Sequence, residues 1–94
     1  MPTLHIEHDV TDLATWISAF NRFAEARRQA GVRAESIQRP VDDPNHMVID
    51  LDFDTTGEAE KFLGFLKDQI WRIRENSPAL AGTPETMILE TVTI

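Results

Sequence analysis

Hydrophobic and polar residues alternate at the start of the chain. Leu4 and Ile6 alternate there with three polar residues, Thr3, His5 and Glu7. Side chains on a strand point alternately to its two faces, so residues 3–8 would have one apolar and one polar face. The pattern therefore predicts a short, half-buried strand.

After this strand the apolar spacing changes from two residues to three or four. This is the period of an amphipathic helix, and its apolar stripe is formed by Leu13, Trp16, Ile17, Phe20, Phe23 and Ala24. Thr11 or Asp12 can cap the N-terminus, and Gly31 is placed to stop the helix. The sequence therefore predicts one continuous helix between Asp12 and Gly31.

The middle of the chain predicts a hairpin. Val32–Arg39 can form a strand that ends at Pro40, and residues 41–45 are dense in turn formers. The next strand has an apolar face formed by Met47, Ile49, Leu51 and Phe53. Its other face is largely acidic and is formed by Val48, Asp50, Asp52 and Asp54. Because a short turn joins the two strands, we expect them to pair.

A second helix and a closing strand complete the pattern. Thr55 and Glu58 fit a capping box, and the apolar stripe that follows is formed by Ala59, Phe62, Leu63, Leu66, Ile70 and Ile73. Phe65 and Trp71 fall outside this stripe. We expect them to pack against residues 79–84 or a subunit contact, with pocket lining as the alternative. The segment Glu85–Ile94 predicts the last strand.

The resulting order, β-α-β-β-α-β, predicts an α+β fold of the ferredoxin-like class. Four strands would form one antiparallel sheet with both helices on one face, in a single domain over residues 1–94. The other face of the sheet would be uncovered. Strand alternation predicts that four polar side chains meet on that open face: His5, Glu7, Asp50 and Asp52.

Composition and charge exclude several classes of function. The net charge of -7 repels a nucleic-acid backbone. The absence of cysteine excludes disulfides, thiolate nucleophiles and cysteine-based metal sites. The N-terminal residues lack the basic and apolar regions of an export signal, and no apolar run is long enough to span a bilayer. We therefore expect a cytoplasmic protein that binds neither nucleic acid nor membrane.

Several scaffold segments carry a resemblance to known proteins. They are His8-Asp9-Val10, Trp16 and Phe20 in the first helix, the turn Pro40–Asn45, and Phe53 followed by Ala59–Leu63. In these segments, and in element order and length over the whole chain, the sequence resembles the dimeric α/β-barrel proteins that include antibiotic-biosynthesis monooxygenase-like domains. None of these residues is a catalytic motif.

The resemblance implies a homodimer in which two open sheet faces pack together, with a possible pocket between each sheet and its helices. Similar proteins include cofactor-independent oxygenases of polyketide-like aromatics, isomerases, haem-degrading enzymes and proteins with no assigned activity. The haem-degrading members use a helix histidine as axial ligand, and neither predicted helix contains histidine. We therefore expect no haem and no other cofactor.

His5 and Glu7 are the candidate catalytic residues. Two residues apart on a strand, they share a face, so Glu7 could orient His5 as a general base. The same pair could be a subunit contact or a solvated pair. Strand alternation turns His5 away from the helices, so the catalytic interpretation requires a bulge or a site in the barrel interior.

Asp50 and Asp52 are candidate binding residues. A row of carboxylates can hold a hard cation, but the sequence contains no recognised metal-ligand spacing, and we expect no metal site. We predict instead that both aspartates face the second subunit and are matched there by cations such as Arg39 or Arg33.

Trp16, Phe20 and Trp71 are the candidate apolar walls of a pocket. One hypothesis is a monooxygenase-like or isomerase-like enzyme that acts on a hydrophobic organic molecule held between sheet and helices. The other is a non-catalytic homodimeric ligand-binding or association module, in which the acidic sheet face and Arg39 serve association. A cavity reached by a titratable group would distinguish the two hypotheses.

Overall fold

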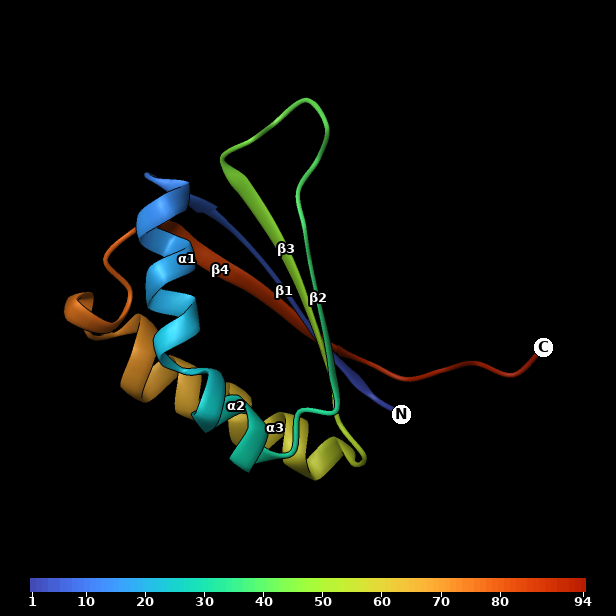
Figure 1. Cartoon of the computed structure of the whole chain (residues 1–94). Coiled ribbons are helices and arrows are strands. Elements are labelled where there is room, and N and C mark those ends of the chain that lie inside the picture. Colours follow the sequence, from blue (N-terminus) through green and yellow to red (C-terminus); the bar gives the residue numbers. More distant parts are fainter.

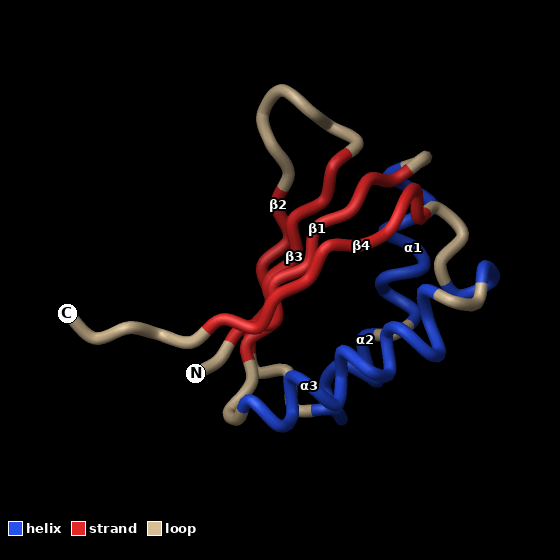
Figure 2. The backbone as a smooth tube through the Cα atoms, turned by 180° about the vertical axis from the view of Figure 1, so that it is seen from behind, coloured by secondary structure: helices blue, strands red, loops and turns tan.

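The computed structural model describes residues 1–94 and has one four-stranded antiparallel sheet with its helices on one side (Figure 1). The strands are β1 (Thr3–Val10), β2 (Ala34–Gln38), β3 (His46–Asp52) and β4 (Leu80–Leu89), in the spatial order β2-β3-β1-β4. From behind, the helices again cover one face, and the loop between β2 and β3 projects beyond the sheet (Figure 2). The predicted ferredoxin-like α+β fold is confirmed.

The helical layer contains α1 (Leu13–Arg22), α2 (Ala24–Ala30) and α3 (Thr56–Phe65). A π-helical segment, η1 (Leu66–Trp71), and a short 3₁₀ turn, η2 (Arg74–Asn76), follow α3. Asp12 caps α1, and Thr55 and Glu58 form the predicted capping box of α3. None of the helices is both long and apolar enough to cross a bilayer.

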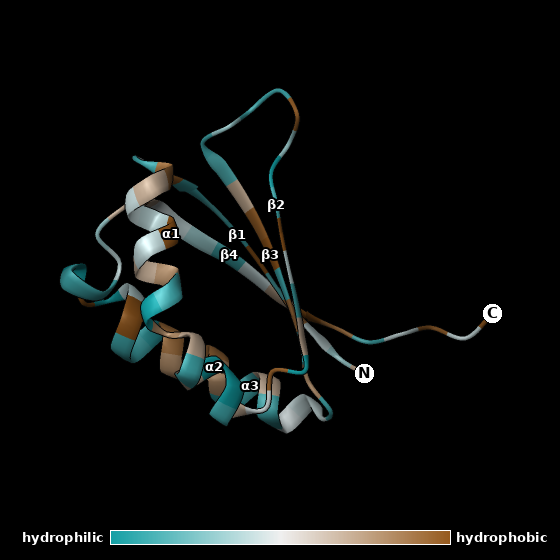
Figure 3. Ribbon diagram, viewed as in Figure 1, coloured by the Kyte–Doolittle hydropathy of each residue, from teal (hydrophilic) through white to brown (hydrophobic).

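The core lies between the sheet and the helices. Alternate residues of β1 and β3 are buried under the helices, while the residues between them face outward. Coloured by hydropathy, the strands carry both brown, hydrophobic segments and teal, hydrophilic ones (Figure 3). The buried side chains that form one continuous cluster include Leu4, Ile6, Met47, Ile49, Leu51, Phe53 and Phe62. The period-2 pattern therefore assigns the residues of β1 and β3 to the correct faces.

The first predicted helix is in fact two helices that meet at Phe23. The Phe23 backbone leaves helical geometry, with φ -103° and ψ 16°. The carbonyl of Phe20 accepts a hydrogen bond from the Arg27 side chain at 2.6 Å, which provides it with a partner outside the regular helical pattern. Gly31 ends α2 in the left-handed region, with φ 102°, as its position predicted.

The second predicted helix changes its winding at Leu66. A π-helical turn uses more residues than an α turn, so it rotates the following side chains relative to a 3.6-residue stripe. This is why Trp71, which lies outside the predicted stripe, still faces the sheet and packs against the core.

The last strand begins and ends about five residues earlier than predicted, at Leu80 and Leu89 instead of Glu85 and Ile94. Its pairing with β1 shifts register between Glu7 and Asp9, and the glycine in the shifted part, Gly82, has φ 72°. The segment 79–84 is therefore mostly a bulged strand rather than a connection. Residues 90–94 extend away from the sheet (Figure 1).

Candidate functional site

An apolar cavity opens between the sheet and the helices. Its empty volume is about 650 Å³ when the open space at its mouth is included. Of the 19 residues that line it, 14 are hydrophobic. Side chains of β1 and β3 form its floor, and the aromatic part of its wall is formed by Trp16, Phe20, Phe23, Phe62, Phe65 and Trp71.

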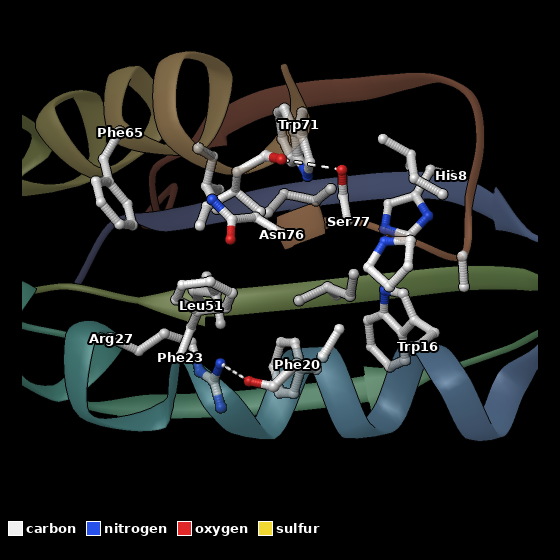
Figure 4. Close-up of a pocket in the computed structure, with 18 of the residues that line it drawn as sticks. His8, Trp16, Phe20, Phe23, Arg27, Leu51, Phe65, Trp71, Asn76 and Ser77 are labelled. Atoms are coloured by element: carbon white, nitrogen blue, oxygen red, sulfur yellow. Dashed lines mark hydrogen bonds between the residues drawn. The ribbon is translucent and has the colours of Figure 1, made fainter. Parts of the chain in front are cut away.

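The three expected wall residues all line this cavity. Trp16 and Phe20, one turn apart on α1, stack with ring centroids 4.9 Å apart and an angle of 23° between the planes. Trp71 lies across the cavity from them, on η1 (Figure 4). Trp16 and Trp71 are the only tryptophans of the chain, so its intrinsic fluorescence comes entirely from the cavity wall.

His8 is a cavity residue that the sequence interpretation did not select. It lies two residues after Ile6 on β1, so strand alternation turns it toward the helices, and it is only 5% exposed. Its ring meets Trp16 edge to face, with 6.0 Å between centroids (Figure 4). The signal was present in the sequence, because the alternation of Leu4 and Ile6 continues to His8.

The surroundings of His8 keep it neutral and fix its tautomer. Burial lowers the pKa of His8 below its ordinary value of 6.5. Nδ1 lies 3.0 Å from the carbonyl oxygen of Asp9, so the single N–H of the neutral ring donates to that carbonyl. The other ring nitrogen, Nε2, has no partner in the chain, and no side-chain nitrogen is both fully buried and unpaired. Nε2 therefore retains access to open space as a proton acceptor.

Three more polar residues line the cavity, and each is held by a backbone carbonyl. The Asn76 amide donates to Gln69 at 2.6 Å, and the Ser77 hydroxyl donates to Ile70 at 2.9 Å, so both fasten η1. Arg27 is 5% exposed and donates from Nη1 to Phe20. None of these three residues, Arg27, Asn76 and Ser77, was a candidate site residue in the sequence.

The opposite face of the sheet carries a chain of five hydrogen-bonded side chains. His5 lies between Asp50 and Glu7, with Nδ1 2.6 Å from the first carboxylate and Nε2 2.8 Å from the second. Glu7 in turn contacts His46 Nε2 at 2.9 Å, and His46 Nδ1 lies 2.8 Å from Asp9. We call these five residues, Asp50, His5, Glu7, His46 and Asp9, the open-face network.

Hydrogen bonds to the carboxylates favour the doubly protonated form of both histidines. The pKa of His5 is raised above 6.5 by Glu7 first and by Asp50 second. The pKa of His46 is raised by Glu7 first and by Asp9 second, and the two histidines lower the pKa of Glu7. An imidazolium has two N–H donors, so only this form can donate to both of its carboxylates.

The structure brings the candidates His5, Glu7 and Asp50 together, but on the face away from the cavity. Asp52 accepts a hydrogen bond from the Thr3 hydroxyl at 2.6 Å. Arg33 pairs with Asp54 at 2.7 Å, and Arg39 makes no ion pair within the chain. Pairing of Asp50 and Asp52 with arginines of a second subunit therefore stays a prediction.

One group of side chains has the spacing of a metal site. Ligand atoms of Asp9, Asp43 and His46 lie within 4.8 Å of one another near the turn before β3. Both ring nitrogens of His46 are already bonded to carboxylates, so a cation would have to displace one of them. These contacts favour the open-face network over metal binding at this place.

Comparisons with known proteins identify the fold. No protein-family model and no curated protein matches the chain. Among solved structures, SnoaB, a cofactor-independent oxygenase from Streptomyces nogalater, has a TM-score of 0.73 and 20% identity, covering 99% of this chain and 94% of its own. An antibiotic biosynthesis monooxygenase has a TM-score of 0.68 and 12% identity, covering 99% of this chain and 100% of its own.

A third structure is described as a dimeric ferredoxin-like protein from an uncultured marine organism. Its TM-score is 0.67 and its identity 12%, and the match covers 98% of this chain and 97% of that one. At these identities the likenesses establish a shared fold. The expected likeness to antibiotic-biosynthesis monooxygenase-like proteins is thus confirmed at the level of the fold.

Proposed function

We propose that this protein binds a planar, mainly hydrophobic aromatic molecule in the inner cavity and removes a proton from it with His8, as a monooxygenase-like or isomerase-like enzyme. The observation that carries the proposal is a neutral imidazole in a cavity lined mainly by apolar and aromatic side chains. A base with a lowered pKa is unprotonated at neutral pH and can accept a proton. In this proposal His8 acts in place of His5, because His5 points away from the cavity.

Both reaction types begin with the same step. His8 Nε2 takes a proton from a C–H group made acidic by a neighbouring carbonyl or phenol ring, which leaves a delocalised carbanion. Return of the proton to another carbon is an isomerisation. In the oxygenase version, which the likeness to SnoaB favours, the carbanion reacts with O₂ and takes up the proton to give a hydroperoxide. Loss of water then converts the original CH₂ group into C=O, so that one O₂ yields one ketone oxygen and one water.

A tricyclic ketone with an acidic CH₂ group, such as anthrone, is a suitable probe. Binding can be followed by quenching of tryptophan fluorescence, since both tryptophans line the cavity. Turnover can be followed by oxygen uptake and by formation of the diketone. Loss of a general base reduces a rate by roughly 10²–10⁴-fold, so His8→Gln should still bind the probe but lose turnover.

His46→Gln is the matched control, because it changes a histidine on the other face of the sheet. It should retain wild-type turnover. Equal turnover by wild type and His8→Gln would overturn the catalytic role of His8. Absence of any fluorescence change with anthrone and with smaller aromatic ketones would overturn ligand binding itself.

The open sheet face favours a second function, a homodimeric association module. Support comes from exposed apolar side chains beside the open-face network: Met87 is 55% exposed and Leu89 is 41% exposed. The pairing of β1 with β4 puts both on the same face as His5. A solved neighbour described as dimeric supports the same idea. We propose that two copies pair through this face and that Arg39 of one copy meets Asp50 and Asp52 of the other.

Sedimentation velocity at low and high salt tests this pairing. The double substitution Asp50→Asn with Asp52→Asn should weaken the dimer and reduce its salt dependence, because it removes charges that the partner's arginines would neutralise. Glu60→Gln, an exposed change on α3, is the control. An unchanged dimer with unchanged salt dependence would refute the arginine–aspartate pairing, and a monomeric wild type would refute the association module.

A further inference from the structure

We infer that Arg27 forms an anion-binding subsite at one end of the cavity, so that the bound molecule is a planar aromatic carrying a carboxylate or phenolate oxygen. The inference rests on the proposed binding of an aromatic molecule in the cavity, and it adds the chemical class of that molecule. Four observations support it: a continuous stacked wall, the burial of the guanidinium, its free donors and the charge around it.

A row of flat side chains in contact with one another runs along the cavity wall from His8 to Arg27. His8 meets Trp16, and Trp16 stacks on Phe20 at 4.9 Å. The guanidinium carbon of Arg27 lies 3.6 Å from the centroid of the Phe20 ring. His8 and Arg27 lie toward opposite ends of the cavity (Figure 4). A ring system stacked along this wall would therefore extend from a neutral imidazole toward a guanidinium.

The guanidinium of Arg27 keeps hydrogen-bond donors that the chain does not use. Nε donates to Glu35 at 2.8 Å and Nη1 donates to the Phe20 carbonyl at 2.6 Å. No side chain or backbone oxygen of the chain accepts from Nη2, and no side-chain nitrogen is both fully buried and unpaired. Nη2 therefore reaches open space, where its two N–H groups can donate to a ligand oxygen.

The charge balance also favours an anion at this position. The Arg27 side chain is 6% exposed, whereas that of Glu35, its ion-pair partner on the edge strand β2, is 40% exposed. Water screens the carboxylate more than the guanidinium, so positive charge remains on the inner side. Arg27 also borders a shallow depression that contains Arg28 and Arg33, but these two pair with Glu25 and Asp54 at the surface. Arg27 is the arginine of this group that lines the cavity.

A pair of probes of equal size separates charge from shape. At pH 7.5, 2-naphthoate is an anion and 2-acetylnaphthalene is neutral, and isothermal titration calorimetry measures both affinities. A charge-assisted hydrogen bond from the guanidinium should make wild type bind 2-naphthoate about 10- to 100-fold more tightly. Arg27→Met should reduce that preference to less than about 2-fold, and Arg28→Met, the neighbouring surface arginine, should preserve it.

Glu35→Gln keeps Arg27 and removes its competing carboxylate, so it should increase the preference for 2-naphthoate. This variant and the wild-type comparison test the subsite even if Arg27→Met fails to fold. Equal binding of both probes by wild type would overturn the anion subsite and leave the apolar cavity as a binding site. An equal loss of the preference for 2-naphthoate in Arg27→Met and Arg28→Met would also overturn the subsite. The general positive charge of the surface would then explain the preference. Failure of wild type to bind either probe would overturn the proposed ligand binding, and the subsite with it.

Discussion

The two faces of the sheet place histidines in opposite electrostatic surroundings. On the covered face, His8 packs against Trp16, and burial lowers its pKa. On the open face, His5 and His46 each lie between two carboxylates, which raise their pKa. His5 and His8 are three residues apart on the same strand, so neither the strand nor the residue type causes the difference. The packing on each face decides whether the imidazole is a neutral base or part of an ion network.

This difference suits the two faces to different tasks. The covered face has one aromatic cavity in which a neutral imidazole can accept a proton. The open face alternates carboxylates and histidines from Asp50 to Asp9, and partial exposure limits their desolvation. The proposed chemistry is accordingly assigned to the covered face, and the proposed contact with a second copy to the open face.

The largest expected effect is the loss of stability when a side chain is truncated on the covered face rather than on the open face. Phe53 is fully buried in the core, and Phe53→Ala should lower the free energy of unfolding by about 3–5 kcal/mol, because it leaves a cavity. Met87→Ala on the open face should change it by about 0.5 kcal/mol or less in the monomer. Urea unfolding at low protein concentration measures both. A comparable loss in the two variants would mean that the open face is as well packed as the core.

Local rules in the sequence predicted the frame of the fold. The capping box of Thr55 and Glu58, the cap at Asp12 and the stop at Gly31 involve residues close together in the chain, and all three occur in the structure. Strand alternation assigned the faces of β1 and β3 for a similar reason, because it depends only on backbone geometry. The same rule also assigned His8 to the covered face, although its role there depends on the aromatic residues of α1.

The features that the sequence did not predict depend on contacts between distant segments. The break at Phe23 accompanies the bond from Arg27 to the Phe20 carbonyl, and the buried Arg27 side chain pairs with Glu35 of β2. In the sequence, Arg27 reads as an ordinary polar helix residue. Likewise the π-helical turn is held by Asn76 and Ser77, which donate to the carbonyls of Gln69 and Ile70. These four contacts involve residues that line the cavity, so the fold was more predictable than the site.

The pH dependence of stability should reflect the histidines of both faces. His5 and His46 have folded pKa values above 6.5, so the stability they contribute is fully present below pH 6.5 and is lost as the pH rises through those values. His8 has the opposite sign. As the pH falls below 6.5, the unfolded chain takes up a proton that buried His8 resists, so stability falls until the folded pKa is reached.

Because the two contributions have opposite signs, we predict that the histidines together give a stability maximum near pH 6.5. Urea unfolding between pH 5 and 9 measures it. His8→Gln should flatten the acid side of the profile, and the double substitution His5→Gln with His46→Gln should flatten the alkaline side. The slopes are compared rather than the absolute stabilities, since each substitution also changes packing. A profile in which His8→Gln alters only the alkaline side would contradict the assignment of the two faces.

The smallest expected effect tests how well the sheet isolates its faces. Glu7 accepts hydrogen bonds from both His5 and His46, whereas Glu85, opposite it on β4, makes no ion pair within the chain. Glu7→Gln should lower the pKa of both histidines clearly, and Glu85→Gln should lower them only slightly through the weaker field of a more distant charge. NMR titration of the imidazole Cε1–H signals measures each histidine separately. Equal shifts in the two variants would contradict a role for direct hydrogen bonds.

His8 provides the remaining test within the same titration. The charge of His46 contributes to the low pKa of His8, although less than burial does. In Glu7→Gln, His46 loses its proton at a lower pH, so the pKa of His8 should rise slightly while those of His5 and His46 fall. A fall in all three would mean that the field of Glu7 acts through the sheet more strongly than the charge of His46 does. A shift of either sign would show that the two faces are electrostatically coupled, and its direction would identify which charge of the open-face network acts on the base in the cavity.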